Sequence, residues 1–202
     1  MKIKAFYNGL LSSNSYVVYD EISYECMIVD LGVKPDYVVD FIKNNGLSVK
    51  YLVLTHGHYD HAHFVGKYME LYSAAKAICH TDEIKVLTDS FANVSDLVGD
   101  SSVYDYDYTV VNDGDLLTLG NTEFKVLSFP GHTPGCICLL CEKDKIMFTG
   151  DVIFAQGYGR TDFKYGSPTL MMQSLRKITT MDEDITIYPG HGESSTLKKI
   201  FE

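Results

Sequence analysis

The first thirty residues alternate short apolar stretches with polar segments. The apolar stretches cover Lys2–Phe6, Ser15–Tyr19 and residues 26–30, and the segments between them contain Gly, Asn, Asp and Glu. Short runs of this kind that are bounded by turn-forming residues predict β-strands. Three of them in direct succession predict an antiparallel meander at the start of the chain.

A helical period follows the meander. Residues 36–45 place four apolar side chains on one predicted helical face: Tyr37, Val38, Phe41 and Ile42. Gly46 is suited to a helix C-cap, so the pattern predicts a helix that ends at residue 45. Residues 51–54 are apolar enough to predict a buried strand, and residues 64–72 predict a second helix.

The second half again combines strands with helices. Residues 82–103 predict a helix followed by a loop, and Ser167 with Pro168 predicts the start of a helix that runs to Ile178. The other predicted elements are strands over Thr109–Val111, Leu116–Leu119, 122–127, 137–140, 146–148 and 185–188, and a terminal helix over 195–201. The alternation predicts a mixed α/β protein.

Four side chains that can bind metals follow the strand at residues 51–54. They are His56, His58, Asp60 and His61, in the segment Thr-His-Gly-His-Tyr-Asp-His. Imidazole and carboxylate groups hold Zn²⁺ and related divalent ions at neutral pH. A rigid strand can fix the first ligand while the following loop supplies the others. The spacing therefore predicts a metal site rather than four structural side chains.

Three further candidate ligands each follow an apolar strand, at a turn that contains Gly. His132 lies in Pro-Gly-His-Thr-Pro-Gly, Asp151 in Thr-Gly-Asp, and His191 in Pro-Gly-His-Gly. Turns rich in Gly and Pro let several strands approach a common point closely. We therefore expect these side chains to converge with the first four at one rim of a sheet.

The composition limits the classes of partner. With 202 residues and 46% hydrophobic content, we expect one domain over residues 1–202 with a substantial core. The formal net charge of −10 argues against nucleic-acid binding, which requires clustered Lys and Arg. We also expect no membrane association and a cytoplasmic location, since neither a spanning segment nor a signal peptide is evident. A small-molecule substrate fits these limits.

Five cysteines are present, and three of them form the pattern Cys-x-Cys-x-x-Cys at positions 136, 138 and 141. That spacing can be mistaken for a zinc cluster. Because the three residues lie in an apolar stretch, the pattern instead indicates a strand. We expect all five thiols to be free and buried, as is usual in a reducing cytoplasm.

The motif His-x-His-x-Asp-His and the segments around His132, Asp151 and His191 resemble, in order, the signature motifs of the metallo-β-lactamase-fold hydrolases. The resemblance spans nearly the whole chain and implies a four-layer αββα sandwich. It is most specific for the short, single-domain glyoxalase II-like hydrolases. The chain ends soon after His191, whereas glyoxalase II itself continues into a helical extension that binds the glutathione tail.

The resemblance also implies roles for the seven candidate ligands. His56, His58 and His132 would hold one metal, and a second would be held by Asp60, His61 and His191, with Asp151 bridging the two. Zinc is the expected metal, and iron and manganese accept the same ligands. A hydroxide shared by the metals would attack a thioester or ester carbonyl, with Asp60 and Asp151 as the catalytic carboxylates. Asp30 matches a family aspartate that supports the ligands from behind.

Other residues are weaker candidates. Arg160 and Tyr158 follow the bridging Asp151 on a Gly-flanked loop, so we expect them to contact the substrate, although Arg160 and Asp162 can equally pair to stiffen the loop. His63 fits a loop or helix-start position better than a substrate contact. His80 ends an apolar run and is expected to be structural.

Two other functions remain open. The segment Gly-Arg-Thr-Asp-Phe is shared with a non-haem iron persulfide dioxygenase branch of the fold, which would use His56, His132 and Asp151 as ligands. Its last motif is usually Pro-Ala-His-Asp, whereas this chain has Pro-Gly-His-Gly. A non-catalytic metal-binding module is the second alternative, but structural zinc sites are closed by four ligands. The sequence leaves the oligomeric state open.

Overall fold

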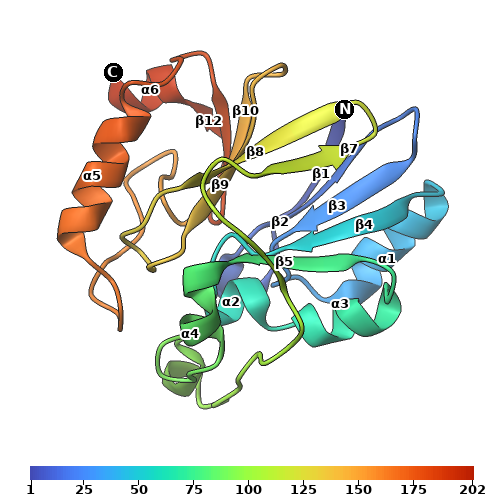
Figure 1. The fold of residues 1–202 in the computed structure, drawn as a ribbon, viewed down its shortest axis with the longest axis horizontal. Helices are drawn as coiled ribbons and strands as arrows, with labels where there is room; N and C mark the ends of the chain where they lie inside the picture. The colour runs from blue at the N-terminus through green and yellow to red at the C-terminus, as the bar shows by residue number, and fades with distance from the viewer.

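The computed structural model of the protein describes residues 1–202 and contains two six-stranded β-sheets that face one another (Figure 1). The first sheet has its strands in chain order: β1 Lys2–Phe6, β2 Ser15–Tyr19, β3 Glu25–Val29, β4 Ser48–Val53, β5 Lys76–His80 and β6 Thr109–Val111. The second sheet has the reverse order, from β12 to β7: β12 Ser195–Thr196, β11 Thr186–Pro189, β10 Ile146–Gly150, β9 Ile137–Cys141, β8 Thr122–Ser128 and β7 Leu116–Leu119.

The first sheet changes from antiparallel to parallel after its third strand. Strands β1, β2 and β3 form the predicted antiparallel meander, and β4, β5 and β6 then add in parallel. Parallel neighbours need crossover connections, and helices supply them. These are α1 Pro35–Asn44, α2 Tyr59–Ala62, α3 Val65–Leu71 and α4 Ile84–Leu87, with the 3₁₀ helix η3 Ser95–Val98 before β6.

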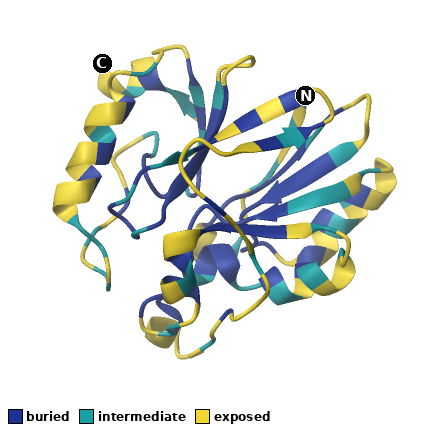
Figure 2. Cartoon of the chain, in the orientation of Figure 1, coloured by how far each residue is buried: buried dark blue, intermediate teal, exposed yellow.

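Helix α1 packs against the first sheet as its apolar pattern predicts, with one exception. Val38 and Ile42 are buried in the cluster that joins the helices to this sheet. Tyr37 is 69% exposed, so its assignment to the buried face was wrong. It lies one position before Val38, at the edge of a narrow apolar stripe. Figure 2 shows the resulting pattern, with exposed residues on the outer side of the helices.

The second sheet is antiparallel apart from the β10–β11 pair, and two helices cover its outer face. Helix α5 Pro168–Ile178 begins where predicted, since the Ser167 hydroxyl accepts a hydrogen bond from the Leu170 amide. Helix α6 covers Leu197–Phe201. The predicted helix at residues 195–201 was wrong for its first two residues, which pair with β11 as β12.

The central core lies between the two sheets. Tyr16 of β2 packs against Phe148 of β10, with ring centroids 5.3 Å apart, and Phe148 also contacts Tyr188 and Phe124. Two further clusters join each sheet to its own helices. The layers therefore run helix, sheet, sheet, helix, which confirms the predicted αββα sandwich.

The elements that differ from prediction have local causes. Strand β5 was not predicted; the apolar run before His80 is short, and Ile78 is the one β-branched residue in Lys-Ala-Ile-Cys-His. Residues 82–103 form α4, η3 and connecting loops, as expected. None of the helices combines the length and apolar character that crossing a bilayer requires. Strands β3, β4, β8, β10 and β11 all end at the rim where the candidate ligands lie.

Candidate metal centre

The first ligand loop leaves β4 and enters α2 through a tightly bonded turn. The Thr55 amide donates to Asp30 Oδ1 over 2.8 Å, which fixes the backbone just before His56. His58 has extended backbone and precedes the first residue of α2, and its carbonyl accepts the His61 amide. The turn therefore aims several side chains inward. The four candidate ligands of the loop are all buried: His56, His58, Asp60 and His61.

The other ligands reach the same point from the second sheet. His132 follows β8 and Asp151 follows β10, and both are buried. His191 follows β11, and its side chain is 29% exposed. Gly190 allows this approach, because a Cβ at its position would lie 2.2 Å from Asp151 Oδ1. A small residue is therefore required where the β11 turn passes the carboxylate.

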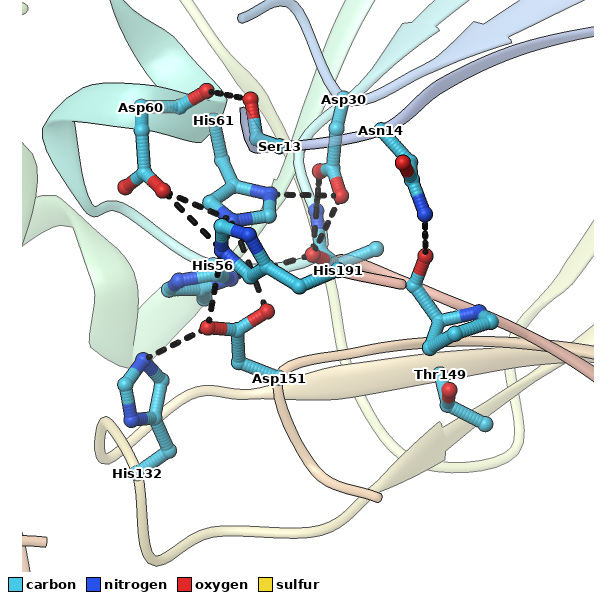
Figure 3. A network of polar contacts seen from close by, with 12 residues as sticks. Ser13, Asn14, Asp30, His56, Asp60, His61, His132, Thr149, Asp151 and His191 are labelled. Atoms are coloured by element: carbon cyan, nitrogen blue, oxygen red, sulfur yellow. Dashed lines mark hydrogen bonds and ion pairs between the residues drawn. The ribbon is translucent and has the colours of Figure 1, made fainter. Parts of the chain in front are cut away.

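All seven predicted ligands lie together, and Figure 3 labels six of them, all except His58. Their ligand atoms form three groups, each with its atoms within 4.8 Å of one another: His56 with His58 and His132; Asp60 with His61 and His191; and His56 with His61 and Asp151. Two of these trios match the two metal positions that the sequence predicts. Which residues bind metal stays a prediction that binding experiments must test.

Asp151 lies between the two predicted positions. Its Oδ2 is 3.5 Å from His132 Nε2 and 3.6 Å from His191 Nε2, and its Oδ1 is 3.5 Å from His61 Nε2 (Figure 3). Asp60 Oδ2 is 3.1 Å from His191 Nε2. The Asp151 carboxylate can thus reach ligands of both trios, as a bridging group must.

Unpaired buried atoms provide a test of whether the residues fit metal ions. His56 Nε2, His58 Nε2, His132 Nε2 and Asp151 Oδ1 are buried and have no hydrogen-bond partner. Buried polar atoms are normally paired, so four orphans in one cluster need an explanation. Bound metal ions would provide partners for these atoms. The mixture of imidazole and carboxylate fits zinc, iron or manganese.

The electrostatics differ between the two groups of candidate ligands. Burial lowers the pKa of His56 and of His58 well below the usual value, and neighbouring histidines lower it further, which keeps these imidazoles neutral. Burial also acts to lower the pKa of His61, but Asp60, Asp30 and Asp151 together raise it to about 10. The carboxylates that raise this pKa favour protonated His61 in the metal-free site, and the same negative charge would attract a metal ion in place of that proton.

Hydrogen bonds from behind orient the imidazoles. His61 Nδ1 donates to Asp30 Oδ2 over 2.9 Å, which agrees with the supporting role predicted for Asp30. His132 Nδ1 lies 2.6 Å from the Arg160 carbonyl oxygen, and His191 Nδ1 lies 3.2 Å from that of Ser12. With Nδ1 used in this way, each Nε2 is left to face the centre.

Glu83 is a buried carboxylate that sequence reasoning missed. It follows β5, and its side chain joins two ligand loops. Oε2 accepts from the Gly57 amide, and Oε1 accepts from the Gly135 amide and the Thr133 hydroxyl, all over 2.6 Å. Burial raises the pKa of Glu83 to about 7, although these hydrogen bonds act to lower it. In the sequence, Glu83 follows an acidic neighbour and a strand that was not predicted, and nothing in this pattern indicates that its side chain is buried.

The two residues predicted to contact substrate differ in position. Arg160 lines a cavity of about 330 Å³ beside the ligands, but its guanidinium also makes two 2.7 Å hydrogen bonds to the Asp162 carboxylate. Both interpretations of Arg160 therefore remain compatible with the structure. Tyr158 is 51% exposed and does not line this cavity.

His63 and His80 lie outside the cluster. His63 Nδ1 is 3.6 Å from Asp100 Oδ2, at the end of α2. His80 Nδ1 accepts a hydrogen bond from the Asp82 amide, which is a structural contact. The three cysteines at 136, 138 and 141 belong to β9 or the turn before it, and all five cysteines are free and buried. This agrees with the expected strand.

Comparisons with known proteins agree with this geometry. Residues 8–191 match the model of the metallo-beta-lactamase superfamily. An uncharacterised protein of Aquifex aeolicus is 31% identical over 98% of this chain and 92% of the relative. The hydroxyacylglutathione hydrolase GloC of Haemophilus influenzae is 32% identical over 91% of this chain and 87% of the relative.

Solved structures show the same arrangement of layers. The crystal structure of BLEG-1, a B3 metallo-beta-lactamase, superposes with a TM-score of 0.88 at 30% identity, over 98% of this chain and 95% of that one. The family model covers all seven candidate ligands, from His56 to His191. The chain therefore belongs to the metallo-β-lactamase superfamily, and metal-dependent hydrolase is the class of enzyme that this membership supports.

Proposed function

We propose that the protein is a metal-dependent hydrolase that cleaves a small thioester or ester. The observation that carries the proposal is the convergence of seven His and Asp side chains beside one cavity, with four of their buried atoms unpaired. Structural zinc sites are closed by four ligands, whereas a reaction site keeps positions open. A seven-ligand cluster beside a cavity therefore fits catalysis better than a purely structural metal.

The proposed holders of two metals are the two trios predicted from the sequence. His56, His58 and His132 would bind the first ion; Asp60, His61 and His191 would bind the second; and Asp151 would contact both. When bound, two divalent ions supply a water of lowered pKa and an electrophile for a carbonyl oxygen. We propose zinc as the metal, with iron and manganese compatible with the same donors.

Side chains of this chain have defined tasks in the proposed reaction. Asp60 Oδ2 lies near His191 Nε2 and His61 Nε2, and neither of these contacts uses Oδ1, so we propose that Oδ1 orients the attacking water. Asp30 keeps His61 oriented through the bond to Nδ1. Phe154 and Phe163 line the cavity, so their rings would shield a bound substrate from part of the bulk water. Water exclusion strengthens the electrostatic interactions inside.

A thioester is the preferred substrate class because of the relative named hydroxyacylglutathione hydrolase at 32% identity. The small cavity also fits a small acyl group better than a large one. Arg160, at the edge of the cavity, is the proposed contact for the substrate. Tyr158, two residues before Arg160 on the same loop, would have to move to contact the substrate.

The test is a hydrolysis panel of thioesters, lactones and phosphodiesters on metal-loaded protein, with the Asp151→Ala variant beside the wild type. We expect thioester hydrolysis, and its loss in Asp151→Ala while the thermal unfolding transition persists. Asp107→Ala, at an exposed position away from the site, is the matched control. Near-normal turnover in metal-loaded Asp151→Ala would contradict the role of this carboxylate, and turnover of none of the substrates would contradict the function.

A persulfide dioxygenase is the second candidate, with His56, His132 and Asp151 as ligands of one iron. His56 and His132 belong to one close group of ligand atoms, and His56 and Asp151 belong to another, so all three lie in the same cluster. The trio of Asp60, His61 and His191 would then have no metal to hold, which favours the hydrolase. Oxygen uptake with glutathione persulfide, together with iron analysis, separates the two. Any metal-dependent turnover would exclude the non-catalytic module.

A further inference from the structure

The cavity beside the ligand cluster has an apolar rim that the proposed chemistry does not require. Its apolar lining residues come from four separate segments: Leu11, Val94, Leu97, Val98, Phe154 and Phe163. Leu11 is 59% exposed, Leu97 is 62% exposed and Val98 is 45% exposed. Exposed apolar side chains that cluster around one opening indicate a binding site, whereas isolated exposed apolar side chains are normal on a protein surface.

The segment that presents Leu97 and Val98 is held in place by hydrogen bonds. It is the 3₁₀ helix η3, and the Ser95 amide at its start donates to Asn93 Oδ1 over 2.9 Å. The Asn93 side-chain amide and the Ser95 hydroxyl both donate to the Ser102 carbonyl, each over 2.9 Å. The two ends of the segment are thereby tied together. This part of the apolar rim therefore has a conformation that hydrogen bonds hold in place.

Backbone strain in the same segment supports a functional role. Val94, which precedes η3, has φ +62°, a left-handed conformation that β-branched residues rarely adopt. Leu11, from another segment of the rim, has φ +49°. Strained residues of this kind persist where the surrounding structure enforces them, and they concentrate at ligand sites. Both strained residues lie on the cavity wall.

No unpaired cationic side chain lines the cavity. Arg160 is the only Lys or Arg among the lining residues, and Asp162 binds its guanidinium through two hydrogen bonds. Arg160 also stacks on the Phe163 ring, with 4.2 Å from Cζ to the ring centroid. The nearby Lys164 is engaged by Asp89. An anionic group that enters the cavity would therefore have to compete with Asp162 for the Arg160 guanidinium.

On the premise of the proposed function, we propose that the site selects esters and thioesters whose group beside η3 is uncharged and apolar, and that it discriminates against anionic groups there. An apolar group gains by covering Leu97 and Val98, because both side chains are then removed from water. A carboxylate in the same place would lose hydration and find no free partner. Leu97 and Val98 are the proposed specificity-determining residues.

The test uses two acetyl thioesters that differ by one carboxylate, made from benzyl thiol and from 4-(mercaptomethyl)benzoate. We expect the kcat/KM of the metal-loaded wild type to be at least about tenfold higher for the benzyl thioester than for the carboxylate thioester. Leu97→Ala should lower kcat/KM for the benzyl substrate about fivefold. Leu97→Lys should narrow or reverse the preference, because it places a cation where the carboxylate lies.

Leu116→Lys is the matched control, because Leu116 is 57% exposed on β7 and does not line the cavity. It should keep the wild-type preference. Metal content and thermal unfolding of each variant are measured first, and Leu97→Met serves as a second conservative variant. Equal or better hydrolysis of the carboxylate thioester by the wild type would overturn the inference and leave the hydrolase function standing. Hydrolysis of neither by metal-loaded protein would overturn both.

Discussion

Replacement of Glu83 by Gln tests how the two ligand loops are held together. The substitution keeps the volume of the side chain but leaves it one acceptor oxygen for three donors: the amides of Gly57 and Gly135 and the hydroxyl of Thr133. If the glutamine oxygen takes the place of Oε1, its NH₂ group faces the Gly57 amide, and two donors then oppose each other. At least one buried donor loses its partner.

The size of the effect follows from that lost bond. An unsatisfied buried donor costs about 1–3 kcal/mol, and at about 2–4 °C per kcal/mol for a chain of this length the melting temperature should fall by about 2–12 °C. Gly57 lies between His56 and His58, so the same disturbance reaches the first metal trio. Loss of a hydrogen bond that positions metal ligands without touching the metal typically lowers metal affinity by about 10–100-fold.

The assay is competition between the protein and a zinc chelator at pH 8, where Glu83 is ionised because its pKa lies near 7. Glu123→Gln, at an exposed position on β8, is the matched control and should bind zinc as the wild type does. Unchanged zinc affinity in a stably folded Glu83→Gln protein would refute the positioning role. It would mean that the Gly57 and Gly135 turns are held without the carboxylate.

Two further predictions follow from contacts and burial. Asp30→Asn should lower zinc affinity by about 10–100-fold, because His61 loses its charged partner. Asn tolerates the left-handed φ of +59° at this position, so the backbone should be kept. Unchanged zinc affinity in chelator competition would contradict a supporting role for Asp30. All five thiols should resist an aromatic disulfide reagent in the native protein and react after denaturation, since burial raises the pKa of Cys26 and of Cys79 to about 12. Fast labelling of a native thiol would show local opening.

The ligand positions could be predicted because each depends on local sequence. An apolar strand followed by a Gly-containing turn places His132, Asp151 or His191 at a strand end, and strand ends meet at one rim. The sandwich itself came from resemblance, since alternation of strands and helices is compatible with many α/β folds. Tyr37 was misplaced because apolar periodicity does not give the width of the buried stripe.

What the sequence could not predict depends on contacts between distant segments. Glu83 is buried because the turns at Gly57 and Gly135 converge on it, from positions 26 and 52 residues away. The apolar wall at η3 requires a left-handed Val94, which no propensity favours. The sequence predicted Arg160 both as a substrate contact and as the partner of Asp162, and the structure shows that it pairs with Asp162 and also lines the cavity.

Whether the protein is a two-metal hydrolase is tested most directly by titrating metal-free protein with zinc while thioester hydrolysis and bound metal are measured in the same samples. We expect binding to saturate at two zinc ions per chain and full hydrolytic activity to require both, because the two proposed trios and Asp151 all lie within one chain. Saturation at one equivalent under excess zinc, with full activity at that point, would contradict it.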